Sequence, residues 1–241
     1  MIDPTARCPK WLIDRIKDSG GTISFYKYMD LVLNDPEYGF YSTGKLKIGK
    51  EGDFCTSPSL SNDFARLLAI QVVDWLFDLD ESGIKSELLS IIEIGPGEGT
   101  LSRDLIVAIA EIAPTLINKI ELILVELNLG MRKRQEKVVN NLEGVNCRWS
   151  NLEDLIIRPV TGVVIANEVL DALPVERLIF SDNKVFRQGV SLKKLNDKYF
   201  LEFVDLKPTS AIMEFLQESN SLLNIEFPPK DICDRWVTEW H

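Results

Sequence analysis

Glu93-Ile94-Gly95-Pro96-Gly97-Glu98-Gly99 is the stretch of sequence that decides the fold. A short apolar run of strand length, residues 89–94, leads into it, and apolar residues at helical spacing follow from Leu101 to Ile109. Glycine tolerates tight turns and lets a ligand approach the backbone closely. The stretch therefore predicts a strand, a glycine turn and a helix, which together place a ligand beyond the carboxyl end of a parallel strand.

The spacing of the glycines narrows the choice of ligand. A dinucleotide-binding turn follows G-x-G-x-x-G/A, in which two residues separate the second and third glycines. Here only one residue separates Gly97 from Gly99, and Thr100 stands where the third glycine of that pattern would be. The Gly-Lys-Ser/Thr of a phosphate-binding P-loop is absent from the sequence. A glycine turn that serves backbone geometry alone remains an alternative.

Two carboxylates at the ends of neighbouring predicted strands favour S-adenosylmethionine over NAD. Glu93 can bind the cationic amino group of an amino-acid moiety, directly or through water, and its charge would oppose a pyrophosphate at the same turn. Glu126 ends the second predicted strand, residues 120–126, where a carboxylate can accept hydrogen bonds from both ribose hydroxyls. A solvated strand end is the alternative for Glu126. With the three glycines, the pair predicts a cofactor site.

The third predicted strand, residues 145–149, ends close to a candidate adenine site. Asn151 and adjacent N–H groups can read the adenine edge, while Leu127 or Leu152 packs on its face. An ordinary turn asparagine explains Asn151 equally well.

Polar side chains gather again after the fourth predicted strand, residues 163–166. Asn167, Glu168 and Asp171 follow it, at the edge where catalytic groups of such a sheet lie. Glu168 can pair with a guanidinium or hold an amine, and so orient a nucleophile toward a methyl-sulfonium. Asp171 has a second interpretation, as the cap of the following helix.

Composition excludes several other classes of function. The 37 acidic and 27 basic residues give a net charge of -10, which repels phosphate backbones and anionic lipid, so nucleic acid is a poor candidate partner. The four cysteines are scattered, and the single histidine, His241, ends the sequence. No metal site, no histidine-based catalysis and no membrane insertion are therefore expected. We expect a cytoplasmic protein, mitochondrial only if a transit peptide is missing from this chain.

Alternating apolar strands and helical segments predict an α/β fold with a parallel sheet covered on both faces, as in class I methyltransferases of the Rossmann-like type. Residues 1–87 are interpreted as an N-terminal helical extension with an active-site loop. Residues 88–241 are interpreted as the cofactor-binding domain, with a β-hairpin inserted at 174–206. Helices are expected at 212–223 and from residue 232 to 240.

Three blocks of the sequence resemble the MidA family of S-adenosylmethionine-dependent methyltransferases. Residues 52–61 are similar to the family's G-D-F-x-T-S-P-E-I-S segment, with Ser59 in place of the usual glutamate. Residues 93–101 match its E-x-G-P-G-x-G-T-L cofactor loop, and residues 167–175 match its N-E-x-x-D-A-L-P-V block. The resemblance covers roughly residues 10 to 240.

The resemblance implies S-adenosylmethionine as cofactor and a protein arginine as methyl acceptor, since mitochondrial members are assembly factors for respiratory complex I. It implies a protein substrate, such as a subunit of complex I. It also implies that Gly95, Gly97, Gly99 and Glu126 hold the cofactor. The transfer site would be lined by Asp53, Thr56, Ser57, Asn167, Glu168 and Asp171.

Four parallel strands are readable, whereas a class I methyltransferase sheet normally has seven, and the family continues beyond the last residue of this chain. We therefore expect a member truncated at the C-terminus, with an apolar edge and face exposed on the fourth strand. A weak or inactive assembly factor that keeps the fold as a binding surface is the second hypothesis. A nicotinamide dehydrogenase is the third, and the glycine spacing argues against it. The sequence does not reveal the methyl acceptor or the oligomeric state.

Overall fold

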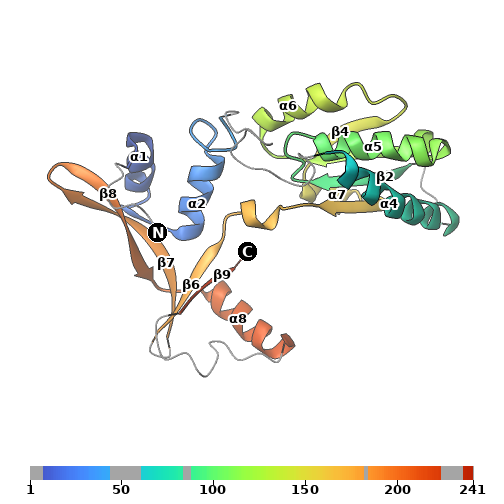
Figure 1. The fold of residues 1–241 in the computed structure, drawn as a ribbon. Coiled ribbons are helices and arrows are strands. Elements are labelled where there is room, and N and C mark those ends of the chain that lie inside the picture. The colour runs from blue at the N-terminus through green and yellow to red at the C-terminus, as the bar shows by residue number, and fades with distance from the viewer. Residues whose placement is uncertain (1–7, 44–60, 84–87, 182–183, 224–235, 241) are drawn as a thin grey trace. The chain divides into compact units, whose positions relative to one another are not determined.

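The computed structural model describes residues 8–43, 61–83, 88–181, 184–223 and 236–240 (Figure 1). Its contacts divide the chain into two compact units. One unit is continuous, Gly39–Ala172, and the other joins Met1–Tyr38 to Leu173–His241.

A four-stranded parallel sheet forms the centre of the unit Gly39–Ala172. Its strands stand in the order β4-β3-β2-β5. Ile94 at the end of β2 pairs with Val125 of β3 on one side and with Ala166 of β5 on the other, so three strands end at the same edge. All four predicted strands are present: β2 (Leu89–Ile94), β3 (Ile120–Val125), β4 (Asn146–Ser150) and β5 (Gly162–Ala166).

Helices cover both faces of this sheet because alternate strand residues are apolar on each side. On one face, buried residues such as Ile91, Leu122 and Leu124 pack with α4 and α5. On the other, Ile92 and Ile123 are buried with half-buried residues of α7 and its C-terminal loop. This α/β arrangement confirms the predicted fold class. The helices are α4 (Asp63–Glu81), α5 (Thr100–Ile112), α6 (Leu129–Val139) and α7 (Leu152–Ile157), with short 3-10 turns η1 (Pro114–Lys119) and η2 (Leu170–Ala172).

The strand β5 lies at one edge of the parallel sheet. Among the described strands it pairs with β2 alone, and Val164 in its middle is 60% exposed. The expected apolar exposure on this strand is therefore present. The pairing with β2 is tight, because a Cβ on Gly162 would lie 1.8 Å from the carbonyl oxygen of Ser90.

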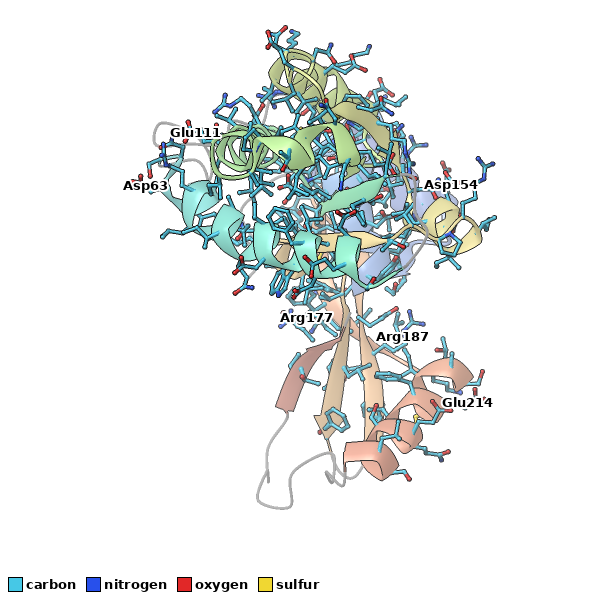
Figure 2. All side chains as sticks on the ribbon, turned by 90° about the vertical axis from the view of Figure 1, so that its right-hand side faces the viewer. Asp63, Glu111, Asp154, Arg177, Arg187 and Glu214 are labelled. Carbon is cyan, nitrogen blue, oxygen red and sulfur yellow. The ribbon has the colours of Figure 1, made fainter. Side chains whose placement is uncertain are left out.

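An antiparallel sheet forms the centre of the other unit, and its longest strand, β7, pairs with three others. It pairs first with β6, then with the short N-terminal strand β1, and along its other edge with β8. The strands are β1 (Thr22–Ser24), β6 (Glu176–Ser181), β7 (Lys184–Leu195), β8 (Lys198–Leu206) and β9 (Trp236–Trp240), and the helices are α1 (Lys10–Asp18), α2 (Phe25–Asn34) and α8 (Ser210–Leu223). Figure 2 shows Arg177 and Arg187 on this sheet and Glu214 on α8.

Two sequence interpretations differ from this unit. Residues 236–240 form the strand β9, which pairs antiparallel with β6, so the helix expected there is wrong. The expected division at residue 87 also differs from the observed units, because Ile23 of β1 pairs with Val190 of β7 and joins the N-terminal segment to the inserted strands. Pairing between residues so far apart leaves no local signal in the sequence.

The described helices include none suited to crossing a membrane. None of them reaches both the length and the apolar character that a span requires. Within the same ranges, no cluster of His, Cys, Asp or Glu side chains is suited to holding a metal ion.

Candidate functional site

The glycine turn after β2 has a backbone that only glycine adopts readily. Gly95, Gly97 and Gly99 have φ angles of 62°, 52° and 82°, all in the left-handed region. The Gly95 N–H donates to the carbonyl of Val125 at 3.1 Å, which ties the turn to the end of β3. Helix α5 begins immediately afterwards, so its free N–H groups lie at the carboxyl edge of the sheet.

Glu93 is buried one residue before the end of β2. It is 4% exposed and accepts a hydrogen bond from the hydroxyl of Ser102 on α5. Burial raises the pKa of the Glu93 carboxyl to about 7, against hydrogen bonds from Ser102 that act in the opposite direction. Glu93 therefore changes charge near neutral pH, beside the glycine turn.

Glu126 follows β3 directly and continues the alternation of Leu122 and Leu124, which places it on the same face of the sheet as Glu93. One carboxylate oxygen accepts the N–H of Asn128 at 2.8 Å, and the other accepts the side-chain amide of Gln135 at 3.2 Å. Burial raises the pKa of Glu126, while these hydrogen bonds and the nearby Arg132 act to lower it.

Asn128 joins the start of α6 to the segment before residue 44. Its side-chain oxygen caps the helix by accepting the N–H groups of Gly130 and Met131, at 2.8 and 3.2 Å. Its amide donates to the hydroxyl of Ser42 at 2.9 Å. Ser42 is thereby held at the same edge of the sheet as Glu126.

Tyr41, next to Ser42, is influenced by one of the predicted transfer-site residues. Burial raises the pKa of Tyr41, and the negative charge of Asp171 raises it further. Sequence reasoning missed Tyr41, Ser42, Asn128 and Gln135 as site residues. The N-cap pattern at Asn128 was readable, but nothing local in the sequence indicated the other three.

The end of β4 is organised around a helix cap. The side-chain oxygen of Asn151 accepts the N–H of Asp154 at 2.7 Å and caps α7, a role that the sequence analysis did not assign to it. Leu127 and Leu152, the two candidate adenine contacts, are 77% and 50% exposed.

The block after β5 lies against the glycine turn. A Cβ on Gly95 would lie 3.1 Å from the side chain of Val169, between the candidate residues Glu168 and Asp171. Glu168 is exposed and has a φ of 52°, which is uncommon for a residue with a side chain. Asn167 is half-buried, and Asp171 is exposed in η2. Asp53, Thr56 and Ser57 lie outside the described residues.

Two surface cavities are lined by residues other than these carboxylates. One, of about 570 Å³, lies between α4 and α5, and its lining includes Asp63 and Glu111, which are labelled in Figure 2. The other, of about 410 Å³, lies beside β4 and α7 and includes Trp149 and Asp154. Neither cavity is lined by Glu93 or Glu126.

Comparison with known proteins identifies what the chain is similar to. A family model described as "Putative S-adenosyl-L-methionine-dependent methyltransferase" matches residues 67–241. The mitochondrial protein arginine methyltransferase NDUFAF7 homolog of Caenorhabditis elegans is 29% identical over 98% of this chain and 60% of its own length. Its Bos taurus counterpart is 32% identical over 69% of this chain and 41% of its own length. A crystal structure of a Burkholderia thailandensis protein bound to S-adenosyl-homocysteine is 31% identical, with a TM-score of 0.73, over 96% of this chain and 55% of that one.

These matches show how much of its relatives the chain spans and in which compartment the relatives are found. The chain spans about half the length of the relatives that it matches. The curated relatives named above are mitochondrial proteins, and this finding contradicts the cytoplasmic location expected from composition and the N-terminal residues.

Proposed function

Because the chain belongs to this family of S-adenosyl-L-methionine-dependent methyltransferases, we propose that it binds S-adenosylmethionine in the unit Gly39–Ala172. The observation that carries the proposal is a turn of three glycines with left-handed backbone conformation, next to two carboxylates, Glu93 and Glu126, that share one face of the sheet. The exposed backbone of Gly95 and the start of α5 allow a ligand to approach the turn. The two carboxylates favour a ligand that carries no phosphate.

In this proposal each part of the cofactor has its own contact. The carboxylate of Glu126 accepts the ribose hydroxyls, and the exposed Leu127 and Leu152 pack on the adenine ring. Asn151 offers its N–H groups to the adenine edge while its oxygen caps α7. Glu93 lies beside the glycine turn, and the cationic amino group of the methionine moiety, bound there, would favour the charged form of a carboxyl whose pKa burial has raised.

We place the methyl acceptor at the end of β5. Bound S-adenosylmethionine supplies a methyl group on a cationic sulfur. Glu168 holds the planar guanidinium of an arginine with two parallel hydrogen bonds, and Asn167 orients it. Asp171, and Asp53 outside the described residues, are carboxylates that can take the proton released by the acceptor nitrogen. Positioning accounts for most of the acceleration in such a transfer.

The support for arginine as acceptor is chemical and comparative. Relatives of this chain are named protein arginine methyltransferases, and a carboxylate is the best partner for a guanidinium. A protein substrate follows, and a subunit of respiratory complex I, which the resemblance implies, is the first substrate to test.

Calorimetry with S-adenosyl-homocysteine tests cofactor binding. We expect the whole chain to bind and Glu126→Gln to weaken binding about tenfold, since a hydrogen bond to a charged group is lost. Glu143→Gln, at an exposed position, serves as the control. Absence of binding at millimolar ligand would contradict the proposal.

Transfer of a labelled methyl group to an arginine-containing protein tests the chemistry separately. Glu168→Gln should lower the transfer rate at least about tenfold while affinity for S-adenosyl-homocysteine stays within about twofold, because Glu168 acts on the acceptor.

A second candidate function is a binding factor that keeps the fold without catalysis. The exposed Val164 on β5 favours it, because an open apolar strand face is suited to a protein partner. Binding of S-adenosyl-homocysteine without methyl transfer to any complex I subunit would support this candidate.

A further inference from the structure

Gln135 on α6 connects the glycine turn, Glu126 and the strand β4. Its side-chain nitrogen donates to the carbonyl oxygen of Gly97 at 2.8 Å and to the carboxylate of Glu126 at 3.2 Å. Its side-chain oxygen accepts the indole N–H of Trp149, on β4, at 2.8 Å. Gln135 is fully buried, with 0% exposure.

Only a side-chain amide of this length satisfies all three partners. The carbonyl of Gly97 and the carboxylate of Glu126 both require donors, and the indole of Trp149 requires an acceptor. These requirements also fix which end of the amide is oxygen. A carboxylate would repel Glu126, and an apolar side chain would leave the indole N–H of the half-buried Trp149 and the carbonyl of Gly97 without this partner.

The bonds to Glu126 leave it suited to a diol. A carboxylate has roughly four acceptor positions. The N–H of Asn128 occupies one on the first oxygen, and the amide of Gln135 occupies one on the second. The backbone N–H of Leu127 also acts on this carboxylate and lowers its pKa. Together these bonds fix the orientation of the carboxylate and leave acceptor capacity on it for the ribose.

We propose that Gln135 is a positioning residue that orients Glu126 toward the ribose and holds the glycine turn in its binding conformation. This inference rests on the proposed function. Gln135 acts through Glu126 and Gly97, and its contribution depends on the ribose hydroxyls of the ligand. A residue that only stabilised the fold would weaken binding of all ligands equally.

The test compares two ligands in the whole chain, S-adenosyl-homocysteine and its 2′-deoxyribose analogue, by calorimetry. Gln135→Met keeps the side-chain volume and removes the hydrogen bonds. We expect it to bind S-adenosyl-homocysteine about 10- to 100-fold more weakly, and to lose most of the wild-type preference for this ligand over the deoxy analogue. Gln71→Met, the same change at an exposed position of α4, should leave both affinities within about twofold.

A second variant covers the case in which Gln135→Met does not fold. Gln135→Glu keeps an acceptor for Trp149 and places a carboxylate against Glu126, so it should show the same loss of preference for the ribose hydroxyl. Since the preference is a ratio of two affinities, a partly unfolded sample does not change it.

The outcomes separate this inference from the proposed function. If wild type fails to bind S-adenosyl-homocysteine, the proposed function is wrong. If wild type binds and prefers the ribose ligand, but the Gln135 variants keep that preference, the role of Gln135 is overturned while the proposed function stands.

Discussion

The buried carboxyl of Glu93 destabilises the folded chain when it is charged, so its effect on stability depends on pH. Its pKa in the folded chain is about 7, above the ordinary glutamate value, because burial disfavours the charged form. A carboxyl with a raised pKa binds a proton more tightly in the folded state than in the unfolded state. The free energy of unfolding therefore falls as pH rises from the unfolded pKa to the folded pKa, by on the order of 3 kcal/mol for this group.

Urea unfolding of wild type and Glu93→Gln checks this expectation. The variant cannot ionise, so its stability relative to wild type should rise by a few kcal/mol between about pH 5 and pH 8. Glu143→Gln, at an exposed position, should keep a constant difference from wild type over the same range. A constant difference for Glu93→Gln would show that this carboxyl titrates normally.

Among single residues, the sequence identified candidates that stand at strand ends, and it missed candidates that only tertiary contacts bring to the site. Glu93, Glu126 and the three glycines stand at strand ends, and a strand end can be recognised from periodicity alone. Gln135 stands in the middle of a helix, and only the fold brings it to Trp149 and Gly97. For Asn151 the sequence indicated an adenine contact or an ordinary turn, and the structure shows the N-cap of α7, which neither interpretation named.

The pairing of β5 with β2 depends on a single glycine. A Cβ on Gly162 would lie 1.8 Å from the Ser90 oxygen and 2.7 Å from the Ser90 nitrogen, both of them backbone atoms that cannot move without separating the strands. Gly162→Ala should therefore lower the free energy of unfolding by about 3 kcal/mol or more.

Gly83→Ala is the matched control for that substitution. Gly83 has a φ of 77° and open space around its missing Cβ, so alanine there meets backbone strain alone. We expect a loss of about 1 kcal/mol. Thermal or urea unfolding of the two variants measures the difference, and equal losses would exclude a steric origin.

At the scale of elements, the local sequence pattern predicted the strands of the parallel sheet, whereas β9 depends on pairing with a distant strand. The apolar runs of β2 and β3 and the helical spacing of α5 are sufficient to identify each element. The segment of β9 has no such signal, because Trp236, Thr238 and Trp240 become a strand only through pairing with β6. Edge strands of this kind depend on a partner that lies far away in sequence.

The net charge of the whole molecule should influence the proposed cofactor and its demethylated product differently. S-adenosylmethionine carries one net positive charge at neutral pH, and S-adenosyl-homocysteine carries none. A chain of net charge -10 attracts the cation at long range, and salt screens that attraction.

We therefore expect affinity for S-adenosylmethionine to fall about two- to fivefold between roughly 20 and 500 mM salt, and affinity for S-adenosyl-homocysteine to stay within about twofold. Calorimetric titrations of both ligands across this range measure the effect. An equal dependence for the two ligands would show that the overall field contributes nothing to binding.

The pairing of Ile23 with Val190 also bears on the order of events during synthesis on the ribosome. The short strand β1 leaves the exit tunnel early, and its partner β7 follows only after the entire unit Gly39–Ala172 has been made. Domains tend to fold as units during translation. The parallel sheet can thus fold during translation, before the N-terminal segment has its partner strand β7. A chaperone that binds this segment would protect it during that interval.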